Sequence, residues 1–222
     1  MRRFFRDNGL SLVMLGLFIS FLAGQALAGH RENNSEREEH GQPPLAFSAY
    51  LGDPHFWEAT AENWESEFFQ MFIYVAFTAF LFQRGSAESK KPDEPNKVDR
   101  DPRKSRNKKE APSPVRKGGF ILRLYEFSLS LAFLLLFLLS FFLHAVGGRG
   151  AYNEEQALHG QSPVSLGEYL FSSRFWFESF QNWQSEFLAV WAIVVFSIWL
   201  RQRGSPESKP VDSPHSETGS GG

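Results

Sequence analysis

Two long uncharged stretches decide the fold class: GLSLVMLGLFISFLAGQALAG at Gly9–Gly29 and FSLSLAFLLLFLLSFFLHAVGG at Phe127–Gly148. Each residue adds about 1.5 Å to an α-helix, so the first stretch is about 32 Å long as a helix. That length crosses the hydrocarbon core of a bilayer, which is roughly 30 Å thick. A soluble chain of 222 residues has no need for two such helices in its core. The sequence therefore predicts two membrane spans.

Two shorter apolar stretches, Phe68–Phe82 and Phe187–Leu200, extend this prediction to four spans. Each covers only about 21–23 Å as a helix, so each spans the bilayer only if its helix continues upstream. We expect spans over residues 63–83 and 182–201. Tryptophans are expected to act as interfacial anchors at four positions: Trp57, Trp64, Trp176 and Trp183. The predicted fold class is an all-α membrane protein with four transmembrane helices.

Capping residues mark where further helices begin. Asp53-Pro54 combines a favourable N-cap with a proline at the first helical position, and it predicts a helix that runs to Gln83. Ser165 and Glu168 have the spacing of a capping box, which predicts a short helix after Ser165.

Overall composition excludes several classes of protein. The chain has 23 Lys and Arg against 25 Asp and Glu, which argues against a nucleic-acid-binding protein driven by bulk charge. It has no cysteine, which excludes disulfides and thiolate metal sites. The mean hydropathy of −0.29 would suggest a soluble protein, but this average hides the segregation of apolar and charged residues along the chain.

The cationic residues predict one orientation in the membrane. Residues 84–119 contain twelve Lys and Arg against six Asp and Glu, a net charge of +6. By the positive-inside rule this linker and both termini are cytoplasmic, and residues 30–62 and 149–181 form outer loops. We expect a multi-pass protein of the inner (plasma) membrane. The linker and the tail at 204–222 have few apolar residues and are expected to be disordered; the linker either contacts anionic lipid or is a solvated tether.

The first span allows one alternative interpretation. A basic start, an apolar stretch and Ala26-Leu27-Ala28 together look like a cleavable signal peptide, which would leave three spans. The apolar stretch is long for a signal peptide, and a second such stretch occurs deep in the chain. We therefore expect Gly9–Gly29 to be retained as a span.

A shift of 119 residues aligns the two halves of the chain without a gap. Between positions 40 and 90, 23 of 51 residues are identical to their counterparts, which indicates an internal repeat. We interpret residues 1–83 as repeat one and 120–203 as repeat two. Each repeat has two spans, so both copies enter the membrane in the same orientation and form parallel repeats.

The repeated motifs are HGQ-x-P at His40 and His159, NW-x-SEF at Asn63 and Asn182, and QRGS-x-ESK at Gln83 and Gln202. This doubled pattern resembles an uncharacterised family of bacterial four-span membrane proteins, a domain of unknown function. The resemblance covers both halves of the chain apart from the linker and the tail. It implies a bacterial inner-membrane protein and supplies no activity or catalytic residue.

Polar residues at one predicted depth form the candidate site. They are Gln25, Asn63, Glu67, His144, Asn182 and Glu186. Carboxylates within a membrane are costly unless they are paired, so we interpret these six as a buried cluster in which His144 bonds a glutamate. In the alternative, Glu67 and Glu186 reach the outer headgroup region and cap local amides.

Two other features have competing interpretations. His40 and His159 match no established zinc spacing, so we expect histidines bonded to backbone in tight turns, and no metal or other cofactor. Small residues recur every four positions in the first span, at Gly16, Ser20, Gly24 and Ala28. Such a ridge permits close helix packing, within the bundle or in a homodimer.

No catalytic motif such as G-x-S-x-G or a Gly-rich phosphate loop is present. We therefore expect a non-enzymatic membrane component whose outer loops form a recognition or structural surface. One alternative is a small ion or solute transporter, since polar residues follow one face of the second predicted span. The other is a membrane-embedded enzyme whose site assembles across helices. Expected partners are the lipid bilayer and either further copies of the chain or another membrane protein.

Overall fold

The computed structural model describes residues 2–219, and every regular element in this range is helical. In chain order the elements are α1 (Arg2–Asp7), α2 (Gly9–Glu39), α3 (Phe47–Tyr50), α4 (Pro54–Phe77), the 3₁₀ helices η1 (Lys97–Asp99) and η2 (Pro102–Ser105), α5 (Ser113–Lys117), α6 (Gly119–Glu126), α7 (Ser128–Leu158), α8 (Leu166–Leu170) and α9 (Ser173–Phe196). The prediction of an all-α protein is confirmed for this range.

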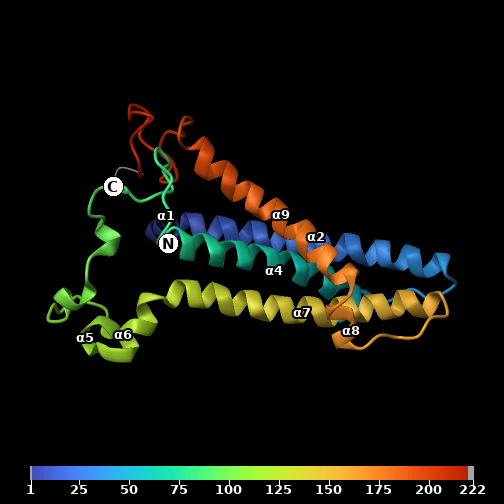
Figure 1. The fold of residues 1–222 in the computed structure, drawn as a ribbon. Coiled ribbons are helices and arrows are strands. Elements are labelled where there is room, and N and C mark those ends of the chain that lie inside the picture. The colour runs from blue at the N-terminus through green and yellow to red at the C-terminus, as the bar shows by residue number, and fades with distance from the viewer. Residues whose placement is uncertain (1, 220–222) are drawn as a thin grey trace. The chain divides into compact units, whose positions relative to one another are not determined.

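Helices α2 and α7 are single unbroken helices of 31 residues each (Figure 1). Both continue past the predicted ends of their spans, to Glu39 and Leu158. By length and composition both could cross a membrane, and only 6% and 17% of their most apolar stretches are buried. A core helix of a soluble protein would be mostly buried. The chain therefore has two membrane-capable helices, which indicates association with a membrane.

Helix α4 begins at the predicted position, and α4 and α9 end at Phe77 and Phe196, before the predicted ends of their spans. The prediction of one helix as far as Gln83 is wrong, and side chains from later in the chain bond carbonyl groups just beyond each helix. The Lys90 ammonium donates to the carbonyl of Ala79 at 3.0 Å. The Arg201 guanidinium likewise donates to carbonyls just after α9, including that of Ser197 at 3.2 Å. After each of these two helices the chain turns away from the helix axis instead of continuing along it.

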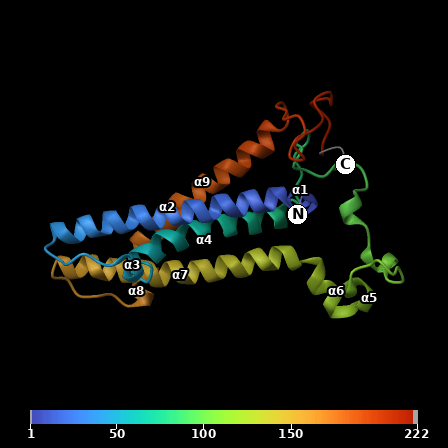
Figure 2. The ribbon, with the colours of Figure 1, turned by 180° about the vertical axis from the view of Figure 1, so that it is seen from behind.

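The chain divides into two compact units. Unit 1 comprises the chain up to Glu62 together with Phe142–Trp176, and unit 2 comprises Asn63–Phe141 together with the chain from Phe177 onward. Unit 1 therefore contains α1, α2, α3 and α8, together with the first parts of α4 and α9 and the second part of α7. Figure 2 shows α3 next to the start of α4, where the chain turns back on itself.

The core of unit 1 is built from small and aromatic side chains. Ala26, Tyr50 and Phe56 are buried, and Leu22 and Trp57 pack against them. The Tyr50 and Phe56 rings meet edge to face with their centroids 5.7 Å apart. Burying a large apolar side chain contributes about 1.5–3 kcal/mol, so these few rings fix the position of α3 against α2 and α4.

The predicted capping box is present at the start of α8. The Ser165 hydroxyl accepts a hydrogen bond from the Glu168 amide, and the Glu168 carboxylate accepts one from the Ser165 amide. These bonds hold the pKa of Glu168 below its usual value. In the first half, the N-cap residue of α3 is Ala46, which has no side chain that could cap the helix. Packing of the buried Tyr50 therefore defines that helix.

The linker, for which we expect disorder, contains three short helical segments in the structure. It carries η1, η2 and α5, and α5 and α6 lie next to each other (Figure 2). Local capping explains part of this order, since the Asp101 carboxylate accepts a hydrogen bond from the Arg103 amide at 3.0 Å. Val115 and Leu122 are buried. Disorder of the linker and of the tail remains a prediction.

Candidate functional site

Two of the six predicted cluster residues, Gln25 and His144, lie in unit 1. The Gln25 amide donates to the Thr60 hydroxyl at 3.1 Å. His144 is fully buried, and its ring stacks on Phe175 with the ring centroids 4.7 Å apart. Its Nε2 lies 4.0 Å from the Glu62 carboxylate. The predicted cluster pairs His144 with a glutamate, and Glu62 is not among its six residues.

The other four predicted residues lie in unit 2. Asn63 and Glu67 are exposed, whereas Asn182 and Glu186 are half-buried. Glu67 belongs to α4 and Glu186 to α9, and the charge of Glu186 acts on Glu67. The Asn182 side chain is used locally, donating to the Glu178 carbonyl at 3.1 Å. The gathering of all six residues into one cluster remains a prediction.

A different acidic residue, Glu65, is buried in unit 2. Its side chain belongs to α4, and the residue is only 1% exposed. The indole N–H of Trp183 on α9 donates to its carboxylate at 2.9 Å. Trp183 was predicted as an interfacial anchor, and in the structure its polar atom points to this carboxylate. A hydrogen bond to a buried carboxylate is strong because little water competes for it.

Aromatic rings surround the Glu65–Trp183 pair. Phe69 is one turn beyond Glu65, and its ring lies 4.6 Å from Trp183 between centroids. The same ring lies 4.9 Å from Phe137 on α7 and 5.7 Å from Phe187 on α9. The carboxylate is therefore held at the edge of an aromatic cluster that joins three helices of unit 2.

Sequence reasoning missed Glu65 because it gave weight to residues shared by the two halves. The position 119 residues later is Gln184, which is exposed, so the acidic side chain at 65 was not selected. A usable signal was present in the helical spacing. Ala61, Glu65 and Phe69 recur every four residues, which places them on one face of α4, and Ala61 is fully buried.

The two halves of the chain contain matching contacts in unit 1, around α3 and α8. The indole N–H of Trp57 donates to the Leu51 carbonyl at 3.0 Å, and that of Trp176 donates to the Leu170 carbonyl at the same distance. These two tryptophans, which we predicted as interfacial anchors, thereby tie the short helices α3 and α8 to the helices that follow them.

Each of the short helices α3 and α8 also contributes one tyrosine. Tyr50 and Tyr169 are buried, and their hydroxyls lie against the α-carbons of Gly29 and Gly148, where any side chain would collide with them. Burial, with the charges of Asp53 and Glu32, raises the pKa of Tyr50 to about 12. The Tyr50 phenol is therefore neutral, and it shares a hydrogen bond of 3.1 Å with Nδ1 of His55.

The interpretation of His40 and His159 as turn residues is confirmed. Nδ1 of His40 bonds the Glu36 carbonyl at 2.8 Å, and Nδ1 of His159 bonds the Glu155 carbonyl at 2.9 Å. Each histidine is followed by a glycine with positive φ, Gly41 at 69° and Gly160 at 67°. The HGQ-x-P motif therefore ends a long helix and turns the chain, with the imidazole acting on the helix's own carbonyl.

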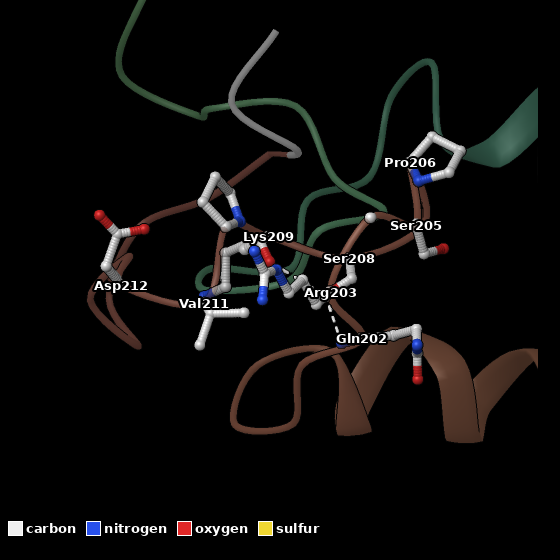
Figure 3. Close-up of a pocket in the computed structure, with 10 residues that line it drawn as sticks. Gln202, Arg203, Ser205, Pro206, Ser208, Lys209, Val211 and Asp212 are labelled. Carbon is white, nitrogen blue, oxygen red and sulfur yellow. Dashed lines mark hydrogen bonds between the residues drawn. The ribbon is translucent and has the colours of Figure 1, made fainter.

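A surface hollow of about 680 Å³ lies within the tail, lined by residues 202–212 (Figure 3). Its polar groups already bond the backbone of their own loop, since the Ser208 hydroxyl accepts from the Gln202 amide and donates to the Lys209 carbonyl. Figure 3 shows the carboxylate of Asp212 apart from Arg203. The corresponding residues of the first half, Arg84 and Asp93, form an ion pair at 2.7 Å. The hollow therefore follows from the folding of this loop.

These observations define a class of protein: an all-helical chain with two membrane-capable helices and a buried carboxylate among aromatic rings. The chain belongs to the family described as a domain of unknown function (DUF6766), whose model matches residues 1–220. No curated protein matches the chain. No solved structure matches it either.

Proposed function

We propose that this protein is a four-span component of the bacterial inner membrane, built from two parallel repeats with both termini in the cytoplasm. Its outer segments form a fixed recognition or structural surface without catalytic chemistry. Helices α4 and α9 supply the second and fourth spans, and large apolar side chains are exposed on α9, including Leu188, Trp191 and Ile193. In water this exposure would be unfavourable, whereas lipid would cover it.

The observation that carries this proposal is the matching construction of the two outer segments. The Asn34 side chain bonds both the amide and the carbonyl of Leu45, at 2.7 and 3.1 Å. Asn153, 119 residues later, bonds the amide and carbonyl of Val164 at the same two distances. Each asparagine clamps the returning chain onto its long helix. Segments fixed in this way offer a preformed surface, which lowers the entropy cost of binding a partner.

Cysteine labelling tests the topology. Because the chain has no cysteine, single cysteines at the exposed positions Ser48, Ser162 and Asn107 can be labelled without background. In intact cells an impermeant maleimide should label Ser48→Cys and Ser162→Cys. It should label Asn107→Cys only after the membrane is opened. Labelling of position 107 in intact cells would contradict the proposed cytoplasmic location of the linker. Protection of both position 48 and position 162 would contradict the proposed outer surface.

A second candidate function, transport of protons or small cations, is favoured by Glu65. A carboxylate within a predicted span marks an ion pathway more often than a packing position. Its place among rings of three helices means that a small shift of α4 or α9 would change its surroundings, and so its affinity for a proton or cation.

Reconstituted protein can decide whether Glu65 supports transport. In liposomes with an internal pH-sensitive dye, the wild-type protein should dissipate an imposed pH gradient. Glu65→Gln should reduce this rate at least tenfold, because an amide has no exchangeable acidic proton. Glu110→Gln, in the exposed linker, is the matched control and should retain the wild-type rate. A wild-type rate equal to that of empty liposomes would contradict proton transport.

A further inference from the structure

The tail folds back onto the loop that follows α4, and Lys209 holds it there. Lys209 is the last residue of the second QRGS-x-ESK motif and is only 1% exposed. Its ammonium donates to the carbonyl of Gly85 in the first motif. It also donates to three carbonyls of the tail itself, those of Pro214, His215 and Glu217, at 3.3, 3.0 and 2.8 Å. A buried ammonium is stable only with such partners, so Lys209 joins the tail to the first loop.

Backbone and hydroxyl groups add further bonds between the same segments. The Gly85 amide donates to the Thr218 hydroxyl at 2.9 Å, and the Gly219 amide donates to the Ser86 carbonyl at 2.8 Å. The Ser86 hydroxyl meets that of Ser197, at the end of α9, at 3.0 Å. Gly85 has a φ of 86°, and a Cβ there would lie 2.8 Å from the His215 carbonyl oxygen. Only glycine fits at this point.

Two carboxyl groups at matching positions of the motifs face each other in this region. Glu88 accepts a hydrogen bond from the Tyr74 phenol of α4 at 2.6 Å. Its carboxyl group also forms a hydrogen bond with that of Glu207, which lies 119 residues later. A hydrogen bond between two carboxyl groups needs a proton on one of them, so this contact is complete only when the pair holds a proton.

We propose that residues 209–219 form an intramolecular clasp that ties the loop after α4 to the end of α9, with the Glu88–Glu207 pair as its proton-operated latch. The clasp fixes the ends of two neighbouring helices against each other. Its opening frees these ends and exposes the two QRGS-x-ESK loops. This device is independent of the orientation in the membrane and of the function proposed above.

The direction of the pH effect follows from the surroundings of Glu88. Burial raises the pKa of its carboxyl group, the Tyr74 hydrogen bond lowers it, and the charge and hydrogen bond of Glu207 raise it further. The clasped state therefore binds the proton more tightly than the open state. This contribution to the clasp is fully present below the pKa of the open state and is lost as the pH rises through the higher pKa of the clasped state.

Hydrogen exchange of the full chain in detergent micelles tests both parts of the proposal. The reporter is the protection of residues 210–219, corrected for the intrinsic pH dependence of exchange. In the wild-type protein it should fall as the pH is raised from 5 to 8. Glu88→Gln keeps an uncharged partner for Glu207. In this variant residues 210–219 should therefore remain protected at every pH. Glu110→Gln, in the exposed linker, should behave as the wild type.

Lys209→Ala should lower the same protection at least tenfold at pH 5, because the carbonyls around Lys209 lose their donor. The matched variant is Lys90→Ala, at the same position of the first motif, where the ammonium bonds the Ala79 carbonyl and Asp99 instead of the tail. It should leave residues 210–219 protected. Unchanged protection of α7 in both variants would show that the fold is intact. An unprotected wild-type tail at all pH values would overturn the clasp, and equal pH dependence in wild type and Glu88→Gln would overturn the latch.

Discussion

Gly147→Leu should destabilise the protein by about 3 kcal/mol, near the upper end of the usual cost of overpacking. In unit 1 a Cβ at Gly147 of α7 would lie 2.8 Å from the backbone nitrogen of Glu58 and 3.1 Å from the carbonyl carbon of Trp57. These atoms belong to the backbone of α4, so no side-chain rotation can relieve the collision. The midpoint of thermal unfolding in detergent, compared with that of the wild type, measures the loss.

Gly24→Leu is the matched control for this substitution. Gly24 lies within α2, and a Cβ at this position would meet no atom within 4 Å. Both substitutions replace glycine within a helix and raise helix propensity by a similar amount, so propensity cannot account for a difference. Because the gain in helix propensity is up to about 1 kcal/mol, the control should be no less stable than the wild type. Equal unfolding midpoints for the two variants would contradict the close approach of α7 to α4.

Trp183→Phe should cost about 2–3 kcal/mol, because it keeps an aromatic ring but removes the N–H that serves the buried Glu65 carboxylate. In a Glu65→Gln background the same change should cost at least about 1 kcal/mol less, since a neutral amide loses less when a donor disappears. Thermal unfolding of the four proteins of this double-mutant cycle gives the coupling energy.

Trp176→Phe supplies the comparison for Trp183→Phe. Trp176 also loses an indole hydrogen bond, but its acceptor is the neutral carbonyl of Leu170 and the site is exposed. Its cost should be about 0.5–1.5 kcal/mol. A cost for Trp183→Phe no larger than this, with no coupling to Glu65, would show that the carboxylate does not depend on the indole.

The sequence was sufficient for features that depend on neighbouring residues. The long helices follow from uninterrupted apolar stretches such as Gly9–Gly29, and the start of α8 follows from the spacing of Ser165 and Glu168. The turns at His40 and His159 were predicted for the same reason, because the imidazole bonds a carbonyl four residues earlier. In each case the deciding interaction lies within one or two helical turns.

Features that depend on distant parts of the chain were not predictable. The Ala79 carbonyl, just beyond the end of α4 at Phe77, is bonded by the Lys90 ammonium from eleven residues later. The burial of Lys209 depends on Gly85, more than a hundred residues away, and a lysine in a polar tail gives no local sign of burial. Glu65 was missed because its partner Trp183 lies on another helix. Local patterns cannot show which of two nearby carboxylates, 65 or 67, meets such a partner.

The contact between a tyrosine hydroxyl and a helical glycine has an evolutionary consequence. Gly29 with Tyr50, and Gly148 with Tyr169, leave no space for even a methyl group between the partners. Substitution of the glycine by alanine is therefore deleterious unless a smaller residue replaces the tyrosine. Substitution of the tyrosine by a smaller residue leaves a cavity unless a larger residue replaces the glycine. Among related chains these positions should be inherited as pairs, each partner substituted only together with the other. Covariation of these two pairs of positions among related chains would be evidence of the contact.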